Sequence, residues 1–298
     1  MTFGDRIRAT LAYFDIFDQP LTGVELYRLL WTGEAETRTA FFLSLEREVA
    51  SGSIESAAGY YFLPNRGSLV RVRARSVRIL EKKMKIAERT MKRLRLIPFL
   101  EAVMVTNTIA LGAPRPGSDI DLCLITRPGR LWTVRLLLIL ILDLRRQRPT
   151  PGRTADKICP CFFIADDRLS LERVADETPD IYLLYWLCHL TPLYDPRGVL
   201  DRVQAANQWV GEFVPRGLRP YRRSTRRRVA DAGWRKFARR VCERVGRGAV
   251  GDAVETLARR LQAARVSRTY GSLAALPDTR VVLDEHMLKF HKNDRRVF

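Results

Sequence analysis

The feature that most constrains the fold is an alternation of apolar segments in the middle of the chain. Three short runs rich in β-branched and aromatic residues are typical of strands, and they cover residues 102–106, 119–126 and 157–165. A longer apolar segment over 129–147 lies between the second and third runs and is long enough for a helix. This order predicts an α/β or α+β domain, which we place at residues 99–175.

Residues 1–66 are predicted to form a separate module of three helices and a hairpin. The helices are expected within 5–17, 18–31 and 35–52, and a proline and a threonine stand where the second one begins. Two strand-like pieces flank Ala57-Ala58-Gly59, which favours a hairpin. Three helices and a hairpin predict a winged helix.

A long helix is expected to join this module to the sheet domain over residues 67–98. Apolar residues recur at alternating steps of three and four from Val77 to Leu94, so they share one face, and Arg and Lys occupy the rest. Pro98 ends the helix.

Residues 176–298 are expected to be mainly helical, which makes the whole chain α+β. The expected elements are helices over 180–191, 200–213, 224–246 and 250–268 and a last strand at 280–284. The buried face of the third helix is predicted to consist of Val229, Phe237, Val241 and Val245.

The net charge of +19 is concentrated in two blocks. Residues 67–100 carry a net charge of +9 and residues 216–298 one of +14, whereas 1–66 and 101–215 carry −3 and −1. Such blocks favour nucleic acid, nucleotide phosphates or an acidic membrane surface, although a solvated Arg-rich face has the same composition. We expect an anionic acceptor or nucleic acid to bind through 67–100 and 216–247. The winged helix is net acidic, which argues for a packing or protein-contact role over DNA reading.

Several classes of protein are disfavoured. No apolar run reaches the roughly 18 residues of a membrane span, since Arg135 interrupts the best candidate. The first residues lack the pattern of a signal peptide, and an odd number of cysteines is typical of reduced thiols, so we expect a cytoplasmic protein. Cys159-Pro-Cys161 with Cys188-His189 matches no common zinc spacing, and we expect ordinary core cysteines there.

The strongest chemical signal is Asp119-Ile120-Asp121 at the start of the second strand. Side chains two apart on a strand share a face, with Cα atoms about 6.5 Å apart. Two such carboxylates can hold a hard cation, Mg²⁺ above all, together with substrate phosphates, although a solvent-exposed strand end gives the same pattern. A pair of such ions about 3.5–4 Å apart stabilises the attacking and leaving oxygens of nucleotidyl transfer.

The context of this pair resembles the polymerase-beta-like nucleotidyltransferase superfamily. A strand ends at Thr106, Asn107-Thr108 follow, and after ten residues comes Asp119-Ile120-Asp121, in the line VTNTIALGAPRPGSDIDLCLIT. That order is similar to the family's Gly-Ser pair and Asp-x-Asp, and the FDQPLT segment resembles a bacterial subgroup with a winged helix. The resemblance implies a nucleotidyltransferase-type sheet, Asp119 and Asp121 as ligands of two Mg²⁺ ions, and a nucleoside triphosphate as substrate. It also implies that Asn107 and Thr108 bind the phosphates.

The sequence departs from the family pattern at two places. Asn107 replaces Gly, and its side chain would crowd a phosphate, whereas Thr108 keeps the hydroxyl. Active members of the family that the sequence resembles usually carry a third carboxylate, the general base, on the later strand, and KICPCFFIA has none. Asp156 at its entrance is the nearest candidate, with Asp166 and Asp167 past its end; an ordinary loop position is the alternative for each.

Two further groups are candidates for the substrate site. Arg115, between two prolines, either contacts a triphosphate or lies in solvent. Near the C-terminus a charged group either closes over a substrate or forms a tail, which we favour, and it contains Lys289, His291, Asp294 and Arg295.

The first functional hypothesis is an Mg²⁺-dependent nucleotidyltransferase that moves a nucleoside monophosphate from a triphosphate to an acceptor hydroxyl. The alternative is a catalytically degenerate protein of the same fold that acts as a nucleotide- or nucleic-acid-binding regulator. The altered Gly-Ser pair and the absence of a carboxylate within 157–165 favour the alternative.

Overall fold

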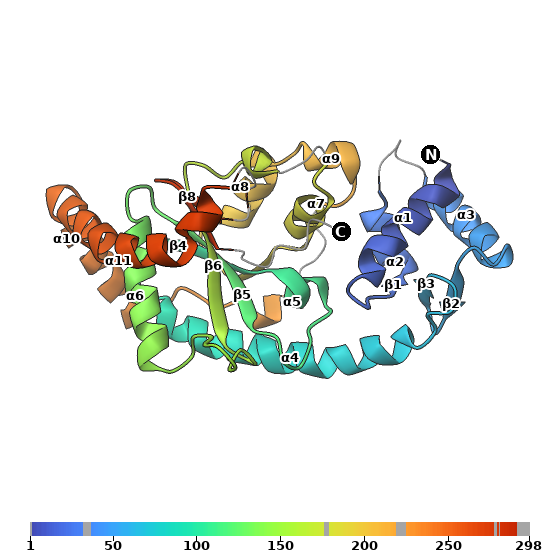
Figure 1. The fold of residues 1–298 in the computed structure, drawn as a ribbon, viewed down its shortest axis with the longest axis horizontal. Helices are drawn as coiled ribbons and strands as arrows, with labels where there is room; N and C mark the ends of the chain where they lie inside the picture. Colours follow the sequence, from blue (N-terminus) through green and yellow to red (C-terminus); the bar gives the residue numbers. More distant parts are fainter. Residues whose placement is uncertain are drawn as a thin grey trace.

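The computed structural model describes residues 2–31, 37–175, 179–218, 225–276, 279 and 281–290. It contains a three-stranded and a six-stranded sheet with helices around both, so the α+β class expected from the sequence is confirmed. The smaller sheet and the first helices lie at one end of an elongated molecule (Figure 1). The long helix α4 (Leu69–Leu94) extends from that end to beneath the larger sheet (Figure 1).

The N-terminal group consists of α1 (Phe3–Asp15), α2 (Gly23–Leu29) and α3 (Arg38–Ala50) and a small sheet. Thr22 and Glu25 form a capping box at the start of α2, which explains why the helix begins there. The sheet is antiparallel in the order β1–β3–β2, and its strands are β1 (Leu21–Thr22), β2 (Glu55–Ala57) and β3 (Tyr60–Phe62). The expected hairpin is therefore present.

Helix α4 occupies the segment where a single long helix was expected. Only the second half of its apolar stripe is covered, since Val77 is 58% exposed whereas Ala87, Met91 and Leu94 are buried. Lys83 is fully buried on the same helix, although it is charged.

The larger sheet has the strand order β7–β4–β5–β6–β9–β8. Strands β5 (Ile120–Thr126) and β6 (Ile158–Ala165) are parallel because α6 (Leu131–Leu144) forms the crossover between them, and the other neighbours are antiparallel. The remaining strands are β4 (Leu100–Val105), β7 (Thr191–Tyr194), β8 (Val281–Leu283) and β9 (Met287–Phe290). Strand β4 is buried throughout and β5 almost throughout, which accounts for their continuous apolar runs.

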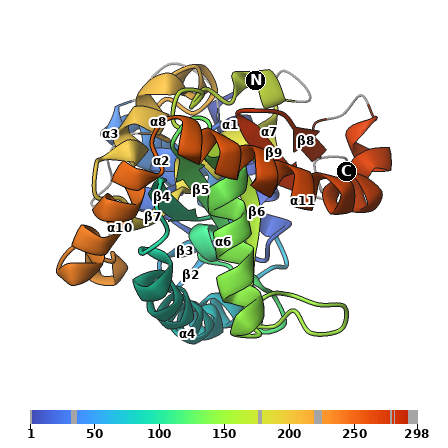
Figure 2. The ribbon, with the colours of Figure 1, turned by 90° about the vertical axis from the view of Figure 1, so that its left-hand side faces the viewer.

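Helices cover both faces of this sheet. Helices α6 and α11 (Ala249–Ala274) pack, with the end of α4, on the face that carries Leu122 and Leu124 (Figure 2). Helices α7 (Ile181–His189) and α8 (Val199–Ala206) pack on the opposite face together with the N-terminal group. Tyr185 of α7 joins the two parts, because its hydroxyl donates to the Leu29 carbonyl and its ring packs against Tyr13. The remaining helical segments are α5 (Asn107–Leu111), η1 (Glu172–Val174), α9 (Val210–Phe213), η2 (Thr225–Arg227) and α10 (Trp234–Val245).

The expectations for the C-terminal region were wrong in several details. The helix expected over 224–246 begins only at Trp234, and the one over 200–213 is two helices separated by a turn. Strand β7 was not expected, because its four residues follow α7 directly and carry no alternating pattern. Within the described residues, no helix is long and apolar enough to cross a membrane.

Two side-chain expectations for the same region also fail. Phe237, Val241 and Val245 of α10 are exposed instead of buried, and Val229 alone of the predicted set is buried. Lys289 lies in strand β9 and is buried, so it is not part of a charged tail. The other members of that predicted group, His291, Asp294 and Arg295, lie outside the described residues.

Candidate functional site

The aspartate pair lies at the beginning of β5 beside a cavity. Asp119 directly precedes the strand and Asp121 is its second residue, so both side chains reach the same side. The cavity has a volume of about 310 Å³. Five residues that the sequence placed in the site line it together, namely Asn107, Thr108, Arg115, Asp119 and Asp121.

The two carboxylates share poorly solvated surroundings. Burial raises the pKa of Asp119. Burial, and then the nearby charge of Asp119, raise the pKa of Asp121 to about 6. Hydrogen bonds from Asn107, Cys161 and Cys159 to Asp121 act in the opposite direction. Two like charges held together in this way favour the binding of a cation, which relieves their repulsion.

Asn107 is oriented by the aromatic residues of α7. Its backbone φ is +54°, in the left-handed region that Asn tolerates better than most residues. Its side-chain oxygen accepts hydrogen bonds from the Tyr182 hydroxyl at 3.1 Å and from the Trp186 indole N–H at 3.0 Å. The amide nitrogen is therefore left to donate to Asp121. The residue that replaces the expected Gly thus holds the metal-binding carboxylate candidate in place.

Asp156, the nearest candidate for a third carboxylate, is not among the described residues that line the cavity. Its side chain is ion-paired with Lys82 and, at 3.0 Å, with the buried Lys83. Its backbone N–H donates to the Ser118 carbonyl oxygen at 3.1 Å, which ties this loop to the one before β5. Asp156 therefore balances the charge of Lys83 below the site.

The other two carboxylate candidates are also engaged elsewhere. Asp166 is ion-paired with Arg202, and Asp167 lies 3.3 Å from the imidazole of His286. Neither of these two aspartates is among the described residues that line the cavity.

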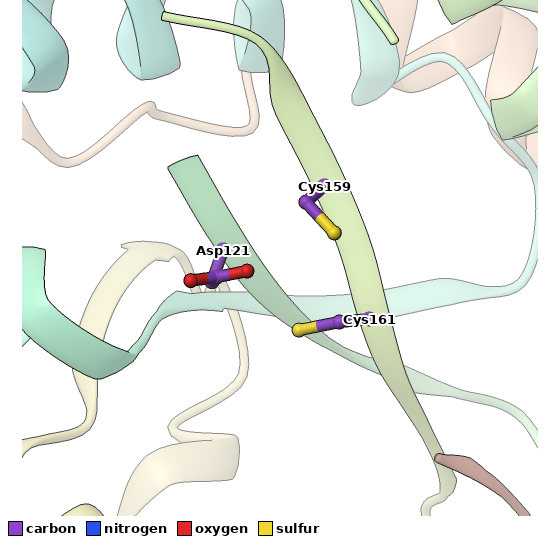
Figure 3. Close-up of side chains that lie close together, drawn as sticks. All are labelled: Asp121, Cys159 and Cys161. Carbon is purple, nitrogen blue, oxygen red and sulfur yellow. The ribbon is translucent and has the colours of Figure 1, made fainter. Parts of the chain in front are cut away.

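Two thiols occupy the strand position where the third carboxylate was sought. In the parallel pair β5–β6, Asp121 is aligned with Cys159. One donor atom from each of Asp121, Cys159 and Cys161 lies within 4.8 Å of the others, and the Cys161 sulfur extends from β6 towards β5 (Figure 3). The sequence names these cysteines but gives no register between strands, so this grouping was missed.

Much of the remaining cavity wall is aromatic. Tyr13 and Phe17 come from α1 and the loop after it, and Tyr182, Trp186 and His189 come from α7. Nothing in the sequence predicted these five residues, because their segments lie about a hundred residues before and about sixty after the aspartates. Arg115 lines the rim with a half-exposed side chain and lies 3.7 Å from Asp18.

The two basic blocks meet in the structure. Glu81 and Glu88 of α4 are the acidic residues of the first block, and Arg227 of the second block is ion-paired with both, at 2.9 Å for Glu88. The blocks are therefore joined through the two acidic residues of the first block.

Comparisons of the chain with protein-family models, with curated proteins and with solved structures found no match.

Proposed function

We propose that this chain is a nucleotidyltransferase that moves a nucleoside monophosphate from a nucleoside triphosphate to an acceptor hydroxyl, with pyrophosphate as the leaving group. The observation that carries the proposal is that Asp119 and Asp121 line the same cavity as Asn107 and Thr108. This combination is the one that the resemblance to the polymerase-beta-like nucleotidyltransferases implies for metal and phosphate binding. The proposal includes the winged-helix identity of residues 1–66 and the nucleotidyltransferase type of the larger sheet.

The donor set is suited to Mg²⁺. Asp119 and Asp121 supply hard oxygen ligands whose mutual repulsion a cation relieves, and Mg²⁺ binds through one or two carboxylates together with substrate phosphates. Mg²⁺ would supply neutralisation of the charge on the triphosphate. Thr108 offers a hydroxyl and Arg115 a guanidinium to the phosphate oxygens.

The remaining parts of the molecule take supporting roles in this proposal. The aromatic wall of Tyr13, Phe17, Tyr182 and Trp186 offers faces on which a base can stack. The blocks 67–100 and 216–247 attract an anionic acceptor or a nucleic acid. The net-acidic N-terminal module makes protein contacts, as it already does with α7.

The direct test is release of pyrophosphate from each of the four ribonucleoside triphosphates in the presence of Mg²⁺ and a mixture of cellular RNAs and proteins as acceptors. We expect release with the wild type and its loss in Asp119→Asn and Asp121→Asn. Asp143→Asn, which alters an exposed carboxylate on α6, is the matched control and keeps activity. Equal release by the wild type and both active-site variants would refute the proposal.

The alternative function is nucleotide binding without transfer, by a degenerate member of the fold. It is favoured by Asp156, which pairs with Lys82 and Lys83, and by the described cavity lining, which contains two carboxylates and no third. Under this alternative the wild type binds a triphosphate in an Asp121-dependent manner, and no labelled nucleotide is transferred to any acceptor.

A further inference from the structure

The group Asp121, Cys159 and Cys161 is formed by a local irregularity in the sheet. Leu122 of β5 is aligned with Pro160, whereas the next residue, Cys123, is aligned with Phe162, so β6 contains one extra residue, Cys161. Such a bulge re-aims a side chain and is frequent beside functional sites. Cys161 and Phe162 consequently both belong to the core cluster on the α7 face, the face of Asp121, although they are neighbours in sequence.

The three side chains gather closely enough to share one ion, since one donor atom from each lies within 4.8 Å of the others. The Cys161 thiol also donates to the Leu122 carbonyl oxygen at 3.7 Å, which fixes it beside β5. Donor atoms within 4.8 Å of one another need to move little, because tetrahedral ligands at about 2.0–2.3 Å from Zn²⁺ lie roughly 3.3–3.8 Å apart. Two sulfur donors and one carboxylate are a soft set that selects Zn²⁺ over Mg²⁺.

We propose that Asp121, Cys159 and Cys161 bind a thiophilic divalent cation, Zn²⁺, with its fourth position directed to Asp119 and the cavity. Asp119 supplies the further donor, because it lines the same cavity two residues before Asp121. Binding replaces two S–H bonds by two Zn–S bonds and releases two protons to solvent, with no change of oxidation state. The proposal goes beyond nucleotidyl transfer and holds whether or not the cavity binds a nucleotide. Each carboxylate has two oxygen atoms, so Asp119 and Asp121 can bind Zn²⁺ through one oxygen and leave the other to the Mg²⁺ of the proposed function.

The test uses the full chain, without nucleotide and under reducing conditions. Metal content is measured after loading with Zn²⁺ and gel filtration, and Co²⁺ is titrated while the thiolate-to-Co²⁺ charge-transfer absorption is recorded. We expect about one ion per chain and a thiolate band. Cys159→Ser and Cys161→Ala are expected to weaken binding by more than about a hundredfold, because loss of even an outer partner of a zinc ligand costs about 10–100-fold.

Cys242→Ser, which removes an exposed thiol on α10, is the control and keeps full binding. Circular dichroism establishes that each variant is folded. Absence of a stoichiometric ion, a Co²⁺ spectrum without a thiolate band, or equal affinity in the Cys159 and Cys161 variants would overturn the proposal. If the wild type binds zinc but releases no pyrophosphate, the proposed transferase function is refuted and the zinc-site proposal is not affected.

A second, independent observation concerns helix α10, which packs with its charged side inward. Arg239 and Glu243 are its buried residues and are paired at 3.0 Å. Glu243 also accepts from the Phe99 backbone N–H, and Arg239 is paired with Asp231 at 2.8 Å. The opposite side is apolar and exposed, to 69% at Trp234, 71% at Phe237, 46% at Val241 and 66% at Val245.

Helix α11 follows after a three-residue turn and also exposes an apolar stripe. The side that faces the protein is mixed: Ala258 and Val266 are buried in the core, whereas Glu255 accepts hydrogen bonds from the backbone N–H groups of Trp132 and Thr133. Its exposed residues at positions spaced by three and four form a second apolar stripe, Val250, Val254, Leu257 and Leu261. The two helices lie at the end of the molecule opposite the N-terminal group (Figure 1).

We infer that the exposed stripes of α10 and α11 bind the surface of a membrane that contains acidic phospholipids. Exposed Arg240, Arg244 and Arg247 accompany the stripe of α10, and Arg259, Arg260 and Arg265 accompany that of α11. Apolar stripes flanked by arginine are typical of helices that lie in the membrane interface. A second copy of this chain is a poorer partner, because residues 216–298 carry a net charge of +14 and the same region of another copy would repel them electrostatically.

Sedimentation with phosphatidylcholine vesicles, or with vesicles of equal parts phosphatidylcholine and phosphatidylglycerol, tests this inference. We expect binding to the acidic vesicles alone, weaker at high salt and reduced at least about tenfold in Phe237→Ser/Val241→Ser, because the membrane-bound state buries both apolar side chains. Leu144→Ser, at an exposed position on α6, is the control. Absence of vesicle binding, or a dimer in light scattering that the same double variant dissociates, would overturn it.

Discussion

Replacement of Asp121 by Asn is predicted to stabilise the metal-free protein at alkaline pH. The folded-state pKa of this carboxyl is raised from 3.8 to about 6, chiefly by burial and by the charge of Asp119. The folded state therefore holds the proton more tightly than the unfolded state does, and the free energy of unfolding falls as the pH rises from about 4 to 6. Above pH 6 the folded protein carries an unfavourable buried charge.

The shift gives the size of the effect. A rise of about two pKa units corresponds to about 3 kcal/mol at 1.36 kcal/mol per unit. Asn removes this penalty but weakens the hydrogen bond from the Asn107 amide, which offsets about 1 kcal/mol. We expect Asp121→Asn to raise the free energy of unfolding by about 2 kcal/mol at pH 8 and to leave it nearly unchanged at pH 4.

Urea denaturation at pH 4, 6 and 8, with a chelator and a thiol reductant, measures this difference. Asp143→Asn is the control, because a surface ion pair such as that of Asp143 with Arg148 contributes about 0–1 kcal/mol. A variant that is less stable than the wild type at pH 8, or equally shifted at all three pH values, would refute the argument that Asp121 carries a buried charge.

Three further predictions concern stability and are measured by the same urea assay at pH 7. Arg239→Met is expected to lower the free energy of unfolding by about 3–5 kcal/mol, because buried Glu243 and Asp231 lose their partner; a loss below 1 kcal/mol would contradict the pairing. Asn107→Ala is expected to cost about 1 kcal/mol more than Asn107→Gly, since φ is +54°; equal losses would argue against the left-handed backbone. Leu138→Ala is expected to cost about 2–5 kcal/mol, as a fully buried residue of α6.

Local patterns in the sequence were sufficient to predict most elements of the first 165 residues. The apolar runs of β4, β5 and β6 are continuous because these strands are covered on both faces, and such runs stand out against polar turns. The Asp119–Asp121 pair interrupts that pattern at a strand start, which is why the carboxylates could be found without a structure.

Periodicity did not show which side of a helix is buried. The apolar positions of α10 were identified correctly as one face, but the salt bridges of Arg239 with Asp231 and Glu243 hold the opposite face against the protein. Val77 of α4 is a similar case, because the helix extends past the sheet that covers Met91.

The features of the site that the sequence did not predict depend on contacts between segments that are distant in the sequence. The approach of Cys159 and Cys161 to Asp121 depends on strand register and on a bulge, neither of which a single sequence specifies. Trp186 and Tyr182 reach Asn107 from nearly eighty residues away, through the packing of α7 on the sheet. Asp156 was chosen because it precedes β6, but its charge is balanced by Lys83, whose complete burial no pattern of basic residues predicts.

Calorimetric titration of a non-hydrolysable nucleoside triphosphate into the protein, with and without Mg²⁺, tests the central claim most directly. The account predicts binding at one site per chain that requires Mg²⁺ and is lost in Asp119→Asn/Asp121→Asn, while Asp143→Asn binds as the wild type does. Binding that is unchanged in the double variant, or no binding of any of the four triphosphates at millimolar concentration, would contradict it.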